Sequence, residues 1–123
     1  MEGIKKENMK YYTKFFYGLI FIMFTSCNSD KEITRLLNSE EKEEIILGAH
    51  KAGESGDKQF VPLLLKNADD RRASINIKFK GFTVYQEKMI ALRKIFKQDP
   101  PTKITDKPDS VVINFYTELS KEN

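Results

Sequence analysis

A short apolar run near the start of the chain constrains most strongly what the rest can fold into. It extends from Phe15 to Phe24, and four lysines precede it: Lys5, Lys6, Lys10 and Lys14. A permanent membrane helix needs about 20 apolar residues to cross a bilayer, so this run is too short to be one. A basic lead, a short apolar stretch and small residues after it are typical of a secretory signal. We therefore expect residues 1–26 to be a signal peptide, with either Met1 or Met9 as the true start.

The end of this signal resembles the lipobox of bacterial lipoproteins. The four residues are Phe24-Thr25-Ser26-Cys27, with Phe24 where the family usually has leucine, and Cys27 is the only cysteine of the chain. The resemblance implies cleavage before Cys27 and attachment of diacylglycerol and palmitate to that residue, which places the protein on membrane lipid. Two or three acyl chains anchor stably, because each buried methylene contributes about 0.8 kcal/mol. The alternative is an ordinary signal peptide followed by a free cysteine.

The residues after Cys27 bear on location and on domain organisation. Asn28 stands where the lipoprotein family has aspartate as its inner-membrane retention signal, so the resemblance favours the outer membrane. The charged stretch 29–32 is similar to the export tag of some surface lipoproteins, and a solvated tether explains it equally well. We expect a lipid-anchored protein of the bacterial cell envelope, with a tether over 27–37 and a folded domain over 38–123.

The domain reads as four helices in two antiparallel pairs, an all-α fold. Asn38 and Ser39 are N-cap residues before a run of glutamates, which favour the positive end of a helix dipole. That first helix should bury Ile45, Ala49 and Ala52 and end at Gly53 to Gly56. A second helix should begin at Asp57, tolerate Pro62 in its first turn and end near Asn67. Its buried side should comprise Phe60, Val61, Leu63, Leu64 and Leu65.

The third helix is the most clearly marked of the four. Thr83 and Gln86 have the spacing of a capping box, and Pro100-Pro101 should end the helix. Lys88 falls inside the apolar arc, so its side chain must either extend to solvent, which we expect, or meet a partner. The last helix should begin at Asp109 or Ser110, and its apolar stripe comprises Val112, Phe115, Tyr116 and Leu119.

Two segments of the domain align with each other without gaps. Residues 46–52 match residues 89–95, an offset of 43, and each segment is followed by a breaker and a second helix. A period of about 40–47 residues with two helices per unit is typical of HEAT repeats, which residues 39–120 resemble. The resemblance implies an α-α stack in which Arg71 or Arg72 follows an aspartate turn. The alternative is two irregular hairpins without repeat ancestry.

The connection between the two pairs, residues 68–82, is long. Residues 75–80 alternate apolar and polar side chains as a half-buried strand does. We expect an ordered, partly extended loop that packs Ile75, Ile77 and Phe79 onto the helices. Because two stacked pairs leave open ends, we also expect partial exposure of at least one of four aromatic residues: Phe79, Phe82, Tyr85 and Phe115.

No group of residues predicts a reaction or a metal site. His50 is the only imidazole and is expected at the boundary of a helix face. Nucleophilic catalysis needs a base beside its nucleophile, and no such pairing is evident. Asp69-Asp70 lacks the spacing of a calcium loop and reads as a turn. We therefore expect neither catalytic residues, metal nor cofactor, and a protein that is not an enzyme.

Charge is distributed unevenly along the domain. Residues 30–57 carry eight acidic and four basic side chains, whereas residues 71–97 carry eight basic and one acidic. The basic side chains are a candidate interaction surface, unless they merely balance the acidic helix: Arg71, Arg72, Lys78, Lys80, Lys88, Arg93, Lys94 and Lys97. The absence of a recognisable motif disfavours nucleic acid. We expect a protein-interaction or scaffolding module with an envelope partner. The alternatives are a small-ligand binder or enzyme using an inter-helical cleft near 71–97, and a shield against a secreted toxin.

Overall fold

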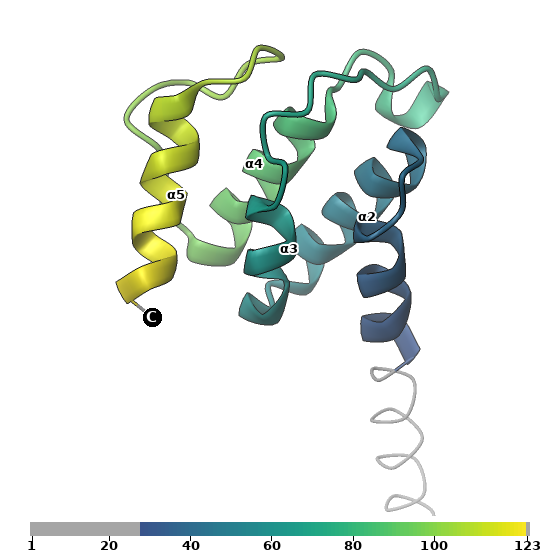
Figure 1. The fold of residues 1–123 in the computed structure, drawn as a ribbon, viewed down its shortest axis with the longest axis horizontal. Helices are drawn as coiled ribbons and strands as arrows, with labels where there is room; N and C mark the ends of the chain where they lie inside the picture. The colour runs from purple at the N-terminus through teal and green to yellow at the C-terminus, as the bar shows by residue number, and fades with distance from the viewer. Residues whose placement is uncertain (1–27, 123) are drawn as a thin grey trace, which may run out of the picture. The chain divides into compact units, whose positions relative to one another are not determined.

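The computed structural model describes residues 28–122, and every regular element in this range is a helix. Residues 28–37 are helical, and the following elements, in which η marks a 3-10 helix, are α2 (Lys42–Ser55), η1 (Lys58–Phe60), α3 (Val61–Leu65), η2 (Ile77–Phe79), α4 (Val84–Phe96) and α5 (Ser110–Glu122). The predicted all-α class is confirmed (Figure 1). The chain divides into two compact units, 1–31 and 32–123, and all contacts below lie within the second.

The expected signal peptide, the lipobox and Cys27 lie outside the described residues. Of the helices that are described, none has both the length and the apolar character required to cross a bilayer.

The helices form two antiparallel pairs, as predicted, although the members differ from those expected. In the first pair Glu32 meets Lys51 at 3.1 Å, so the helix over 28–37 runs against α2. In the second, Val61 and Phe96 line one cavity and the Lys66 carbonyl accepts from Lys88, so α3 runs against α4. The pairing shifts because the sequence did not indicate a helix before residue 38.

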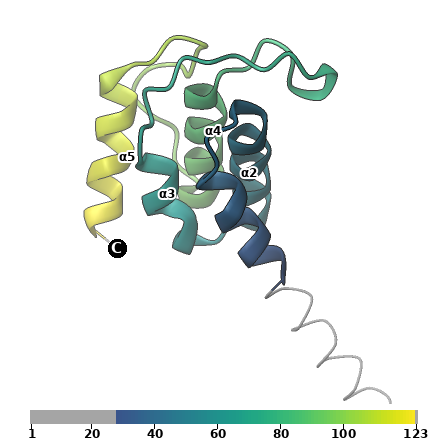
Figure 2. The ribbon, with the colours of Figure 1, turned by 45° about the vertical axis from the view of Figure 1, so that its right-hand side comes forward.

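Helices α2 and α4 lie side by side and run in the same direction, as Figure 1 and Figure 2 show. Near their N-terminal ends Ile46 and Val84 belong to one buried cluster. Near their C-terminal ends Lys94 Nζ lies 2.7 Å from Glu54 Oε1. A Cβ atom on Gly53 would lie 3.0 Å from the Cα atom of Ala91, so the glycine allows the two helices to approach closely.

The main hydrophobic cluster draws on all of these helices, a smaller one joins α2, η2 and the start of α4, and both use the predicted faces. Ile45, Ala49 and Ala52 of α2 are buried, as are Val112 and Tyr116 of α5. Burying a large apolar side chain contributes about 1.5–3 kcal/mol, so these contacts dominate the stability of the stack. The largest fully buried side chains are Tyr85, Tyr116, Phe60, Ile46, Leu64, Met89, Leu92, Val84 and Val112.

The folded unit begins earlier than predicted, because residues 32–37 are part of it. Ile33, Leu36 and Leu37 are 2%, 2% and 6% exposed, and they form the inward face of the helix over 28–37. Gly48 of α2 faces this helix, and a Cβ atom there would lie 2.8 Å from the Cβ atom of Leu36. The boundary expected at residue 38 is therefore too late.

The predicted helix ends are partly correct. Asp57 accepts a hydrogen bond from the Gln59 amide, Asp109 accepts one from the Val111 amide, and the Thr83–Gln86 capping box is complete. The expected caps Asn38 and Ser39 are wrong, since α2 begins at Lys42 with Glu41 as its N-cap residue. That helix also continues through Gly53 to Ser55, and Gly56 is its C-cap residue, with a φ of 67° that suits glycine. Helix α4 ends at Phe96, before the prolines.

The connection over 68–82 is ordered, but only one of its three apolar residues packs as expected. Phe79 is 7% exposed, whereas Ile75 and Ile77 are 81% and 94% exposed. The alternating pattern indicated a half-buried strand, yet the segment turns through η2, so alternation no longer places the three side chains on one face. Phe82 is 37% exposed, which confirms that at least one of the four aromatic residues reaches the surface.

Candidate functional site

The candidate basic surface does not form a single patch. Arg71, Lys78 and Lys80 are exposed on the connection between α3 and α4. Arg93 and Lys97 are exposed at the other end of α4. Arg93 comes nine positions after Val84, a rise of about 14 Å along the helix. The remaining three cations, Arg72, Lys88 and Lys94, each have a partner within the fold, which reduces what they can offer to another molecule.

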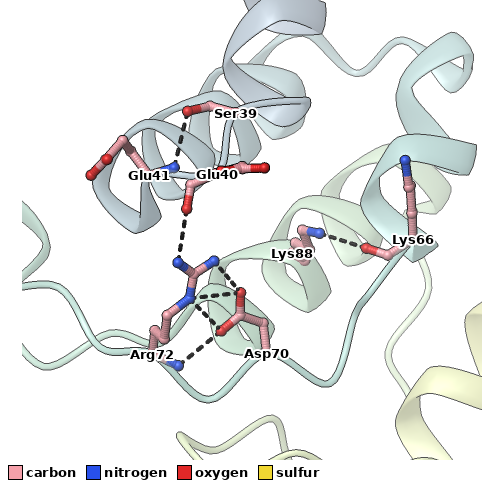
Figure 3. Close-up of polar contacts among 7 residues, drawn as sticks. All are labelled: Ser39, Glu40, Glu41, Lys66, Asp70, Arg72 and Lys88. Carbon is pink, nitrogen blue, oxygen red and sulfur yellow. Dashed lines mark hydrogen bonds and ion pairs between the residues drawn. The ribbon is translucent and has the colours of Figure 1, made fainter.

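Arg72 braces the connection against the start of α2. Its guanidinium contacts both carboxylate oxygens of Asp70, with Nη2 2.7 Å from Oδ2, and Nη1 donates to the Glu40 carbonyl at 2.8 Å (Figure 3). The hydrogen bonds from Arg72 hold the pKa of Asp70 below its ordinary value. These contacts commit Arg72 to the fold rather than to another molecule.

Lys88 is buried, contrary to the expectation that it extends to solvent. The residue is 3% exposed, and its Nζ donates to the Lys66 carbonyl at 2.7 Å, just after α3 (Figure 3). Carbonyls at a helix C-terminus lack intrahelical donors and attract cations, which explains the placement. Burial lowers the pKa of Lys88, and Asp70 opposes that shift. Lys88 is therefore not a surface residue.

These polar groups line a cavity of about 420 Å³. Its walls are the end of the first helix, the turn before α2, the end of α3 and Lys88 of α4. Both basic and acidic residues line it, so the cavity suits a polar ligand rather than an apolar one. The lining residues are Leu37, Asn38, Ser39, Glu40, Ile45, Leu63, Lys66, Asn67, Asp70, Arg72 and Lys88.

A second cavity, of about 310 Å³, lies between α3 and the C-terminal ends of α4 and α5. Most of its walls are apolar, and Lys58 and Ser120 are its polar residues. The lining residues are Lys58, Val61, Pro62, Leu65, Phe96 and Ser120.

The segment over 73–82, here called the isoleucine loop, is fixed by hydrogen bonds to α2 and by hydrogen bonds across its own base. Glu43 of α2 accepts from the Ser74 hydroxyl at 2.6 Å and from the Ile75 amide at 2.9 Å. These bonds, with the Ser74 contribution largest, hold the pKa of Glu43 below its ordinary value. The Ser74 amide donates to the Phe82 carbonyl at 2.8 Å, which closes the base of the loop.

Phe79 fixes the middle of the isoleucine loop. Its ring packs with Ile45, Ile46 and Val84, and its centroid lies 5.3 Å from that of His50. His50 is half-buried, as expected for a residue at the edge of a helix face. With its base and Phe79 fixed, the loop presents Ile75 and Ile77 to solvent. Nothing in the sequence distinguishes Glu43 as the residue that holds this loop, because other glutamates stand beside it in the chain.

The described part of the chain contains no cluster of three histidine, cysteine or carboxylate side chains that could hold a metal ion. Comparison with protein-family models, with curated proteins and with solved structures gives no match. A function must therefore be argued from the residues of this chain alone.

Proposed function

We propose that the protein is a lipid-anchored component of the bacterial envelope that acts as a protein-interaction module. The lipobox-like sequence ending at Cys27 supports the anchor, and Asn28 supports an outer-membrane destination. In this proposal Cys27 carries the acyl chains and residues 28–31 join it to the folded unit that begins at Glu32.

The observation that carries the interaction role is the exposure of two isoleucines on an ordered loop. Ile75 and Ile77 are 81% and 94% exposed, while Glu43 and Phe79 hold the loop on either side. Scattered single apolar residues on a surface need no explanation, but two large apolar side chains exposed within three residues of an ordered loop do, and exposed apolar patches mark interaction sites. A fixed loop also loses little conformational entropy on binding.

We further propose that α2 with α3, and α4 with α5, are two degenerate HEAT-type repeats. Helices α2 and α4 hold the segments that align at an offset of 43, and in the fold they are parallel neighbours. Equivalent helices of successive repeats lie side by side in such stacks. The repeat surface would then present rigid side chains to a partner and has no inherent chemistry.

The anchor is tested by labelling cells with a palmitate analogue. Wild-type protein should carry the label and remain with membranes, and Cys27→Ser should lose both, because serine cannot form the thioether. Ser26→Ala is the matched control, since it keeps a small residue before the cysteine. A labelled Cys27→Ser variant, or an unlabelled wild type, would refute lipidation at this residue.

The interaction role is tested separately, by affinity capture of the tagged full-length protein from native membranes in mild detergent. A partner recovered in constant ratio across independent preparations is expected. If the purified protein is recovered alone, the interaction role is refuted while the anchor can still stand.

The polar cavity favours a second candidate function, the binding of a small polar ligand near the basic segment. A cavity of about 420 Å³ with Lys88, Asp70 and Arg72 in its wall supports it. A ligand at 100 times its Kd stabilises the native state by about 2.7 kcal/mol, so a panel of small carboxylates and phosphates should include one that raises Tm. The shift should vanish in Lys88→Met and persist in the control Lys80→Met. Equal shifts in both variants, or none in the wild type, would refute this function.

A further inference from the structure

We propose that the isoleucine loop docks into an apolar pocket with an acidic rim on a partner protein, with Ile75 and Ile77 as the inserted side chains. This inference rests on the proposed interaction role and names the kind of partner that the role requires.

The two isoleucines are already in a form suited to insertion. Both are β-branched and restricted in rotamer, and each is almost fully exposed. Short hydrogen bonds fix the backbone around them: the Asn76 amide donates to Ser74 Oγ at 3.0 Å and the Lys78 amide donates to Asn76 Oδ1 at 3.0 Å. A partner therefore does not have to order the loop in order to bind it.

The charges beside the isoleucines define the rim of the partner site. Lys78 and Lys80 are exposed on the same loop, and Lys78 Nζ lies 5.4 Å from the centroid of the Phe79 ring. Glu43, the carboxylate that contacts the loop, already accepts two hydrogen bonds from it. The loop thus offers apolar and cationic groups, and an acidic rim around an apolar pocket is their electrostatic complement.

The position of the loop favours a protein over the membrane that would hold the anchor. Glu32, at the start of the folded unit, pairs with Lys51 in the C-terminal half of α2. The loop is fixed by Glu43 in the first turn of the same helix, about 12 Å away along its axis. In Figure 1 and Figure 2 η2 lies by the N-terminal end of α2, where Phe79 packs with Ile45 and Ile46. Glu32 and the loop therefore meet opposite ends of α2, so a partner protein can contact the loop without contacting the residue that begins the folded unit.

Site-specific photo-crosslinking in the full-length protein tests this inference. p-Benzoylphenylalanine in place of Ile77, irradiated in native membranes, should give one adduct with a second protein. The same group in place of Val111, which is 49% exposed on α5, is the matched control and should give none. The crosslinked peptide, identified by mass spectrometry, should lie in an apolar site bordered by aspartate or glutamate.

Charge reversal then tests the rim. Lys78→Glu with Lys80→Glu should lower the adduct yield at least about tenfold, as should Ile75→Asp. Lys103→Glu with Lys107→Glu on the exposed linker should leave the yield unchanged. Replacing the partner's rim carboxylates with lysine should restore binding to the charge-reversed loop, which a structural defect in either protein would not allow.

Other outcomes overturn the inference in distinguishable ways. Capture that persists in the loop variants would refute the loop as the contact while leaving the interaction role intact, and no capture by the wild type would refute the role itself. An adduct joining two copies of this chain would refute a distinct partner. Loop-dependent binding of the full-length protein to vesicles of phosphatidylglycerol, without a protein adduct, would refute a protein occupant.

Discussion

At the residue scale, two glycines decide how closely the helices of this domain approach. Gly48 faces the helix over 28–37 and Gly53 faces α4, and a Cβ atom at either position would meet a neighbour at 2.8 Å or 3.0 Å. The sequence offered Gly53 only as a helix stop, because a glycine inside a helix and one at its end look alike without the neighbouring helix. The role of Gly53 depends on Ala91 of α4, which is distant in sequence, so the sequence alone could not show it.

Gly48→Ala should destabilise the protein, although alanine is the better helix former by about 1 kcal/mol. The added methyl group would overlap Leu36, and overpacking typically costs about 1–3 kcal/mol, so the net effect should be a loss. Asn114→Ala, on the exposed side of α5, is the control and should change stability by less than about 0.5 kcal/mol. Urea denaturation measures both. A Gly48→Ala variant as stable as the control would contradict the packing described.

At the element scale, the sequence predicted the helices after residue 38 well, but missed the helix over 28–37 and the course of the segments between helices. The capping box at Thr83 and the stripe containing Val112 and Tyr116 are local patterns, and both are correct. Whether the side chains of Lys88 and Ile77 point inward or to solvent depends on partners elsewhere in the chain. Lys88 meets a carbonyl of α3, and the loop with Ile77 is held by Glu43 of α2, so neither was visible in its own segment.

The isoleucine loop should respond to acid through Glu43. Its pKa is lowered in the folded protein by the Ser74 hydroxyl and the Ile75 amide, so the ionised form stabilises the loop. That stabilisation is present above the ordinary value of 4.5 and is lost as the pH falls through the lowered pKa. Exchange of the Ile75 amide, corrected for its intrinsic rate, should therefore accelerate several-fold below that window.

Glu43→Gln should show the faster Ile75 exchange already at pH 7 and little further change in acid. Glu44→Gln is the matched control, because Glu44 bonds to Arg35 and Ser39 and not to the loop. If Glu43→Gln exchanged at the wild-type rate at pH 7, Glu43 would not be holding the loop.

The helix over 28–37 should be essential for folding. A chain that begins at residue 38 would lack Ile33, Leu36 and Leu37, which together contribute about 4–9 kcal/mol as an upper estimate. That is comparable with the whole stability of a small domain. Circular dichroism should show cooperative melting for a chain beginning at Asn28 and an unfolded spectrum for the shorter one. Equal melting temperatures would mean that the first helix is dispensable.

At the scale of the whole molecule, the folded unit has different features at the two ends of α2. The N-terminal end of the folded unit lies by Lys51, and the isoleucine loop lies beyond the first turn of α2. In the proposed function the isoleucine loop is the part that contacts a partner. This arrangement requires that the loop be a fixed part of the fold.

The most direct measurement of that requirement is backbone ¹⁵N relaxation of the chain beginning at Asn28. Order parameters at the Ile75 and Ile77 amides should be about 0.8 or higher, close to the value of about 0.85 typical of rigid backbone such as that of α4. Values below about 0.6 at these two amides would show a flexible segment whose exposed isoleucines carry no defined shape, and would contradict the account.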